Sequence, residues 1–251
     1  MQTIDLNCDM GELKEGQIRN YDAQIMPFIS SCNIACGFHS GTPQLMTQTI
    51  RAAIKHRVKI GAHPSYNDRE NFGRKSLKVD PEVLMADLTY QTCALKGIVE
   101  SYGQRLLHVK PHGALYNDLL VNDTLAELFV STIKTIDPAL KIVTLANANI
   151  VDYCAAQGVG VIQEGFADRR YEQATQLRSR AYPDAVLRNP EDVLAQIKGF
   201  LNKEVRLADG TTAKIKVDTI CLHSDTPGAV SLSQTIYNYL REHDVKITAP
   251  A

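Results

Sequence analysis

The sequence predicts an α/β fold, a seven-stranded (β/α) barrel of the TIM-like class. Short apolar runs alternate with helical patterns along the whole chain, and nearly every run ends in a group of polar side chains. Strict alternation of this kind favours a parallel sheet. A barrel brings the carboxyl ends of all its strands to one face, where barrel enzymes build their active sites. The placement of the polar groups therefore favours a barrel over an open doubly wound sheet.

The expected strands are short runs that we interpret as apolar at successive positions, as in strands covered on both faces. They cover residues 3–7, 28–34, 59–62, 106–110, 141–145, 160–164 and 219–223, with a doubtful eighth at 245–248. Three helices are expected to begin where a capping residue precedes proline, at Thr42, Asp80 and Asn189. Asp209-Gly210 predicts a small β-hairpin near 204–215. Because no linker or charge block interrupts the pattern, we expect a single domain over residues 1–251.

Composition narrows the class of function. The net charge is −1, so the chain offers no broad basic field for nucleic acid or an anionic membrane surface. No apolar run approaches the roughly 20 residues that span a bilayer, and the first seven residues do not resemble a secretion signal. We therefore expect a cytoplasmic protein. The six cysteines form no C-x-x-C motif and are expected to be buried free thiols, except Cys36 in a glycine-rich turn.

The polar groups at the strand ends contain acids, histidines, amides and one lysine. Any one of them has an ordinary structural explanation, because Asp9 could cap a turn and His39 or His63 could be satisfied in the core. Lys110 is harder to explain, because it follows residues 106–109, which we interpret as an apolar run, and a buried charge needs a partner. Several such groups on one face of a barrel favour a functional site over separate structural roles. The wider set also includes Glu12, Asp68, Asp168, Arg170 and Thr226.

This set of residues suits hydrolysis, in which a carboxylate or histidine positions water and a lysine or metal polarises a carbonyl. The candidate catalytic residues are Asp9, Lys110, His112, Glu164, His223 and Asp225, and the candidate substrate-binding residues are Asn7, Asn33, Arg74, Asn117 and Arg169. Asp9, His39 and His63 are also candidate ligands of a divalent metal. The usual P-loop, dinucleotide, serine-hydrolase and H-E-x-x-H motifs are absent.

Six stretches at these positions resemble the LamB/YcsF family. They are residues 5–12 (DLNCDMGE), 33–39 (NIACGFH), 61–66 with 72–74 (GAHPSY, FGR), 109–117 (VKPHGALYN), 164–171 (EGFADRRY) and 223–229 (HSDTPGA). The resemblance runs in order from residue 5 to about residue 230. Ser40, Thr42 and Ala174-Thr175 depart from the usual pattern of the family.

The resemblance implies a seven-stranded barrel similar to the glycoside hydrolase/deacetylase type. It also implies a role as the A subunit of an ATP-dependent 5-oxoprolinase, which opens 5-oxo-L-proline (pyroglutamate) to L-glutamate together with the B and C subunits. ATP, with Mg²⁺, is implied as the cofactor by the resemblance alone, because no motif in this chain places a nucleotide. Phosphorylation of the lactam carbonyl oxygen would make attack by water feasible, and such a site needs positive charge.

Two other functions stay open from the sequence. One is a metal-dependent carbohydrate deacetylase that uses Asp9, His39 and His63. The other is a non-catalytic scaffold or carbohydrate-binding subunit. Dependence on ATP separates the oxoprolinase from the deacetylase, and turnover of pyroglutamate with partner subunits separates both enzymes from the scaffold.

Overall fold

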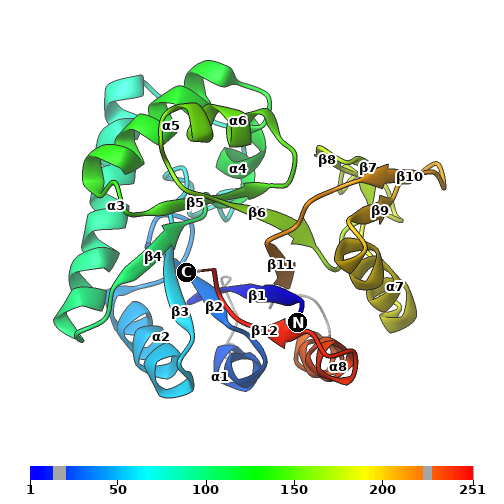
Figure 1. The fold of residues 1–251 in the computed structure, drawn as a ribbon. Coiled ribbons are helices and arrows are strands. Elements are labelled where there is room, and N and C mark those ends of the chain that lie inside the picture. The colour runs from blue at the N-terminus through cyan, green and yellow to red at the C-terminus, as the bar shows by residue number, and fades with distance from the viewer. Residues whose placement is uncertain (14–20, 223–227, 251) are drawn as a thin grey trace.

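The computed structural model describes residues 1–13, 21–222 and 228–250. Seven parallel strands close into a barrel, with β11 paired to both β6 and β1 (Figure 1). The wall consists of β1 (Thr3–Met10), β2 (Ser31–Ala35), β3 (Lys59–His63), β4 (Leu106–Val109), β5 (Lys141–Leu145), β6 (Val161–Phe166) and β11 (Thr219–Leu222). The predicted seven-stranded, TIM-like barrel is confirmed. The doubtful eighth strand, β12 (Lys246–Ile247), pairs only with the start of β1 and is not part of the closed wall.

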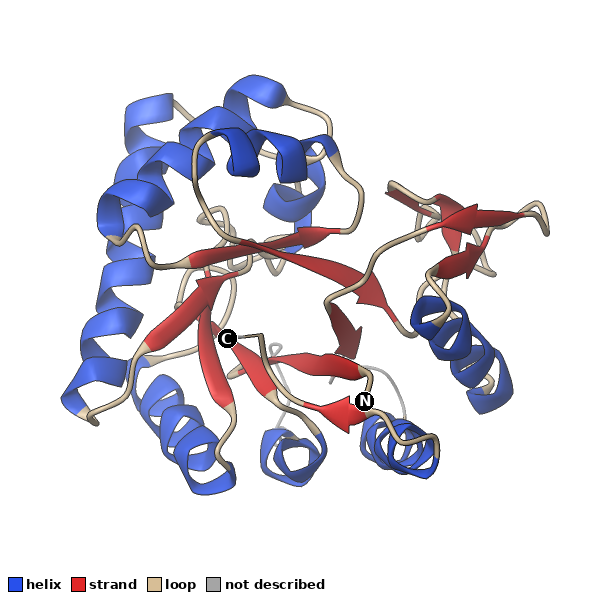
Figure 2. Cartoon of the chain, in the orientation of Figure 1, coloured by secondary structure: helices blue, strands red, loops and turns tan. Residues whose placement is uncertain are grey.

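Helices lie outside the strands, as Figure 2 shows. They are α1 (Asp22–Ile25), α2 (Pro43–His56), α3 (Pro81–Ser101), α4 (Gly113–Leu119), α5 (Asp123–Ile136), α6 (Asn149–Ala156), α7 (Pro190–Leu201) and α8 (Ala229–Glu242), with a 3₁₀ turn η1 (Met26–Phe28). The side chains of Thr42, Asp80 and Asn189 accept backbone hydrogen bonds at the starts of α2, α3 and α7, so these three predicted caps are confirmed. Among the described helices, none is both long enough and apolar enough to cross a bilayer.

Two short antiparallel pairs lie outside the barrel wall. β7 (Tyr171–Gln173) pairs with β8 (Gln176–Leu177), and β9 (Glu204–Arg206) pairs with β10 (Thr212–Lys214). The second pair is the hairpin around Asp209-Gly210. The cysteines are free thiols, but the sequence-based placement was wrong for two of them, because Cys36 is buried and Cys93 is exposed.

The interior of the barrel is polar, which differs from the apolar strands that the sequence suggested. In β1 the even-numbered residues are apolar, whereas Asp5, Asn7 and Asp9 alternate with them and are also buried. Alternate residues of a strand point to opposite faces, so the acids and amide share one face of β1. Asp5 accepts hydrogen bonds from the hydroxyls of Ser30, Ser31 and Thr219 at 2.5, 2.7 and 2.6 Å. A hydrogen-bonded network thus occupies the centre, where TIM barrels usually hold branched apolar side chains.

Gly61 in β3 makes room for the ring of His108 in β4. A Cβ atom at position 61 would overlap Nε2 of His108, far inside van der Waals contact. Since His108 is only 1% exposed, its ring has little space into which to move. The glycine is therefore required by side-chain packing inside the barrel.

We expect Gly61→Ala to lower the free energy of unfolding by about 1–3 kcal/mol, the usual range for an overpacked core. Gly97→Ala is the matched control, because Gly97 is exposed on α3 with no neighbouring atom within 4 Å of the added Cβ. That control should gain about 0.5–1 kcal/mol from helix propensity. Urea denaturation measures both. Equal stability of the two variants would contradict the packing argument, and the double variant Gly61→Ala/His108→Ala should recover part of the loss.

Candidate active site

Five of the residues that the sequence singled out meet in one buried network at the carboxyl ends of β1, β2, β4 and β6. The Lys110 ammonium lies 2.9 Å from Oδ1 of Asp9 and 2.8 Å from Oε1 of Glu164. Asn33 donates its amide hydrogens to Oδ1 of Asn7 and Oδ1 of Asp9, both at 2.8 Å. Asn7 in turn donates to Oε1 of Glu164 at 3.0 Å. The polar groups of four strands therefore orient one another.

Local structure explains why these side chains converge. The register of β1 and β2 sets Asp9 beside Asn33. Lys110 directly follows β4, and its backbone N–H donates to the carbonyl of Ala62 in β3. The structure corrects two expected strand ends, because β1 continues to Met10 and β6 to Phe166. Asp9 therefore lies within β1 and not after it, and Glu164 lies inside β6 and not at its end.

Lys110 is held as a buried cation. Its side chain is 3% exposed, and burial alone would lower its pKa. The negative charges of its neighbours, with Asp9 the largest, more than offset burial and raise the pKa of Lys110 well above its ordinary value. A permanently charged ammonium cannot serve as a base, but it can stabilise negative charge that develops on an oxygen of a bound substrate.

His108 is a member of this network that the sequence analysis missed. The sequence around residues 106–109 resembles an apolar run, but His108 lies within β4, and its Nε2 is 2.6 Å from Oδ1 of Asn33. Burial lowers the pKa of His108 to about 3, so the ring is neutral and donates this hydrogen bond. The donation fixes which way the Asn33 amide faces. His108 and Lys110 are two residues apart, so in an extended strand their side chains point to the same face. This spacing is the signal in the sequence that links His108 to the network.

A second cluster adjoins the network and consists of Glu12, His39, His63 and His112. Glu12 follows β1, His39 lies in the loop after β2, His63 ends β3, and His112 immediately precedes α4 after β4. One ligand atom from each residue lies within 4.8 Å of the others, so the four could hold a metal ion. The sequence pointed to Asp9, His39 and His63 as metal ligands. The structure instead gathers Glu12 and His112 with the two histidines, and Oδ2 of Asp9 lies 3.4 Å from Nε2 of His63.

Packing and charge determine the state of two rings in this histidine cluster. His39 stacks on His112 with ring centroids 3.7 Å apart, and burial lowers the pKa of His39 to about 3. His63 is also buried, which by itself would lower its pKa, but the nearby Asp9 carboxylate raises the pKa of His63 above its ordinary value. The ring of Phe72 packs edge-on against His39 and His112 and covers the cluster from the β3–α3 loop.

Other residues proposed from the sequence have different surroundings. The exposed Arg74 lies over the ring of Phe72, with its guanidinium carbon 5.2 Å from the ring centroid. The exposed Asn117 donates to the carbonyl of Gly113 in its own helix. Arg169 is buried and donates to the carbonyls of Arg178 and Ala185, and burial lowers its pKa to about 10. His223 and Asp225 lie outside the described residues.

Four buried polar atoms in or beside these clusters have no hydrogen-bond partner within the described part of the chain. They are Oε2 of Glu164, the hydroxyl of Tyr116, Nδ1 of His39 and Nδ1 of His108. Tyr116 lies on α4, and its ring packs edge-on against Phe166 at 5.8 Å. Burial, and then the nearby Glu164 carboxylate, raise the pKa of the Tyr116 hydroxyl well above its ordinary value, so the two groups lie near each other. Buried polar groups are normally hydrogen-bonded, so a bound substrate or water beside this pair would find partners in it. Tyr116 was not singled out from the sequence, where it resembles an ordinary helical core residue.

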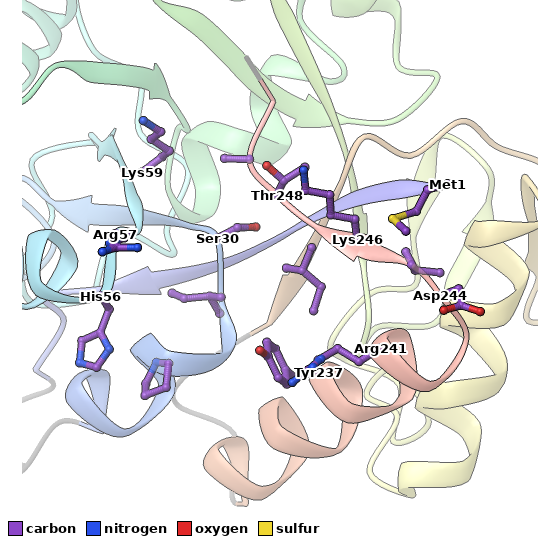
Figure 3. Close-up of a pocket in the computed structure, with 15 residues that line it drawn as sticks. Met1, Ser30, His56, Arg57, Lys59, Tyr237, Arg241, Asp244, Lys246 and Thr248 are labelled. Atoms are coloured by element: carbon purple, nitrogen blue, oxygen red, sulfur yellow. The ribbon is translucent and has the colours of Figure 1, made fainter.

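A separate cavity of about 540 Å³ opens at the amino ends of the strands (Figure 3). His56, Arg57 and Lys59 line one side, and Arg241 and Lys246 line the other. Because Lys59 begins β3 and Lys246 pairs with Thr3 at the start of β1, this cavity lies at the opposite end of the barrel from the lysine network and the histidine cluster.

Comparison with known proteins places the chain in a family. The model of the LamB/YcsF family matches residues 4–251. The A subunit of 5-oxoprolinase from Bacillus cytotoxicus is 40% identical over 252 residues, covering 100% of both chains. The A subunit of 5-oxoprolinase from Bordetella parapertussis is 39% identical over 247 residues, covering 98% of each.

Solved structures agree with this similarity. A lactam utilization protein from Thermus thermophilus superposes with a TM-score of 0.92 at 33% identity, over 99% of this chain and 100% of that one. The peptidoglycan deacetylase PdaC from Bacillus subtilis, at 13% identity and a TM-score of 0.51, covers 99% of this chain and 87% of its own, and it shares the fold alone. On the match of the family model and the full-length relatives, this chain belongs to the LamB/YcsF family.

Proposed function

We propose that the chain is the A subunit of an ATP-dependent 5-oxoprolinase, which opens 5-oxo-L-proline to L-glutamate. The names of its full-length relatives support the substrate class. The observation that carries a catalytic role is the buried Lys110 ammonium between the carboxylates of Asp9 and Glu164. A fixed cation of this kind, beside acids at the mouth of a barrel, suits a reaction in which charge develops on oxygen.

The chemistry of a lactam explains why ATP is needed. A five-membered lactam is a nearly unstrained amide, and its nitrogen is a poor leaving group. Transfer of the terminal phosphoryl group of ATP to the carbonyl oxygen would release ADP and open the carbonyl carbon to attack by water. The ring C–N bond would then break as its nitrogen takes a proton, and a second water would hydrolyse the resulting acyl phosphate to glutamate and inorganic phosphate. Mg²⁺ would accompany ATP. In the proposal Lys110 stabilises the charge on the oxygen, Asp9 activates the water, and Glu164 keeps Lys110 in place. His112, His223 and Asp225 are proposed to assist in proton transfer.

Substrate binding is proposed to involve the same face of the barrel. Asn7 and Asn33 hold the two catalytic acids in orientation through the hydrogen bonds described above. Arg74, Asn117 and Arg169 stay proposals as substrate-binding residues. Of these, Arg169 already donates to two backbone carbonyls and would act by holding the loop that contains Arg178. Oε2 of Glu164 and the hydroxyl of Tyr116 are the further groups that we propose as direct contacts to the substrate.

The proposal includes the B and C subunits as partners and a cytoplasmic location, where ATP is available. The relatives are named as one lettered subunit of an enzyme, which implies an assembly of several subunits.

We therefore expect the purified chain alone to release little or no glutamate from 5-oxoproline, and to gain ATP-dependent activity when the partners are added. The measurement is glutamate release with and without ATP and with and without partners. Full ATP-dependent turnover by the isolated chain would refute the need for partners.

The histidine cluster favours a second candidate function, a metal-dependent carbohydrate deacetylase. Its support is the convergence of Glu12 with three histidines at the strand ends. Such an enzyme would release acetate from an acetylated sugar without ATP. The same purified protein, assayed for acetate release in the absence of nucleotide, distinguishes the two functions, and inactivity in both assays with partners present would favour a binding subunit.

A further inference from the structure

We propose that Glu12, His39, His63 and His112 bind one divalent transition-metal ion of the zinc class. The ligand atoms are Oε1 of Glu12, Nε2 of His39, Nε2 of His63 and Nδ1 of His112. This site is independent of the proposed oxoprolinase, which invokes a metal only as the companion of ATP, and it would supply the metal that the second candidate function requires. The direction of the imidazole lone pairs supports the site independently of turnover.

Backbone carbonyls determine the tautomers of two of these rings. Nδ1 of His63 lies 2.7 Å from the carbonyl oxygen of Lys110, and Nε2 of His112 lies 2.9 Å from the carbonyl oxygen of Phe72. A carbonyl oxygen can only accept a hydrogen bond, so each of these nitrogens carries a hydrogen. In the neutral rings, the opposite nitrogens, Nε2 of His63 and Nδ1 of His112, therefore present lone pairs.

These two lone pairs point into the same space. Nδ1 of His112 and Nε2 of His63 are 3.0 Å apart, and Oε1 of Glu12 lies 3.3 Å from the first and 3.8 Å from the second. Three acceptors facing one another without a hydrogen between them repel, and a cation at their centre removes the repulsion. Histidines that bind metals usually donate the N–H of their other ring nitrogen to a carbonyl or carboxylate oxygen, and both His63 and His112 do so here.

The spacing and the atom types indicate which ion fits. His39 completes the group. Its Nε2 lies 3.0 Å from Oε1 of Glu12 and donates to it in the metal-free ring, and Nδ1, which has no partner among the described residues, can carry the hydrogen when Nε2 binds the ion. A tetrahedral ion with bonds of about 2.1 Å places its ligands about 3.4 Å apart, close to the four separations given above, and all four ligand atoms lie within 4.8 Å of one another. Three imidazoles with one carboxylate suit Zn²⁺ or another first-row ion, whereas Mg²⁺ and Ca²⁺ prefer oxygen ligands. The proposed ion is thus chemically distinct from the Mg²⁺ that accompanies ATP.

A protonated His63 is the competing explanation. Asp9 lies 3.4 Å from Nε2 of His63, and a second proton on that nitrogen could bridge to His112 without any metal. The two explanations make opposite predictions for metal titration, because a proton bridge leaves no open lone-pair site for an added ion.

The test is a titration of tag-free, chelator-treated protein with Zn²⁺ by calorimetry, and with Co²⁺ by visible absorption. We expect about one ion per chain, and a Co²⁺ spectrum of the intense tetrahedral type. His63→Gln and His112→Gln should each weaken binding by about 100-fold or more, and circular dichroism checks that they fold. The control His56→Gln changes an exposed histidine in the separate cavity and should bind like the unaltered protein.

Two results would overturn the site. One is the absence of stoichiometric binding, together with an imidazolium signal from His63 in nitrogen NMR. The other is unchanged affinity in both cluster variants. Because these measurements follow binding and not glutamate release, a failed metal site and a failed oxoprolinase assignment give different outcomes.

Discussion

Replacement of Lys110 by methionine is expected to abolish turnover and to lower the free energy of unfolding by about 3–5 kcal/mol, as for a buried ion pair with one partner removed. A lysine that directly follows β4 and does not belong to the apolar core would by itself be a tolerant site. Its ammonium instead lies 2.9 Å from Asp9 and 2.8 Å from Glu164, and Glu164 is fully buried. Without Lys110 the two carboxylates would be left together without a cation.

Lys214→Met provides the matched control. Lys214 also forms an ion pair, 2.7 Å from Glu204 in the hairpin, but its side chain is 82% exposed. Exposed pairs contribute about 0–1 kcal/mol, so this variant should unfold almost like the original protein. Urea denaturation of both variants gives the comparison. Similar losses in the two variants would show that Lys110 does not compensate buried charge, and would remove the electrostatic argument for the network.

Asp9→Asn is expected to reduce turnover by about 100-fold or more while the protein remains folded. The asparagine keeps an oxygen that can accept from Asn33, and Lys110 keeps Glu164 as its ion-pair partner. What the substitution removes is the basic carboxylate, and general bases typically contribute about 10²- to 10⁴-fold in rate. The loss should fall on kcat more than on KM, because the group acts on water and not on substrate affinity.

The assay uses the complex with partner subunits, and melting temperature is measured on the same samples. Asp209→Asn, in the exposed turn of the hairpin, serves as a control that should retain full turnover. A variant at position 9 that melts early but turns over normally while folded would assign Asp9 to structure. A folded variant with normal kcat would likewise remove Asp9 as the base.

Much of the fold was determined by local features of the sequence. Capping residues before proline set the starts of α2, α3 and α7, and the hairpin turn at Asp209-Gly210 needs no distant contact. The polar residues at the ends of the runs identified Asp9, Lys110 and Glu164 as neighbours, because all strands of a parallel barrel end on one face. These inferences rest on signals that lie within a few residues of each other.

Only the tertiary structure decided how those residues divide between two clusters. Asp9 pairs with Lys110, whereas Glu12, three residues later, joins His63 and His112, because barrel closure and strand stagger set which strand ends touch. The spacing of His108 from Lys110 placed the two on one face of the strand, but only the structure showed that this face is the interior, where Gly61 on the neighbouring strand makes room for the ring. Contacts between residues far apart in sequence depend on the register of whole strands, and no local pattern in one strand specifies its register against the next.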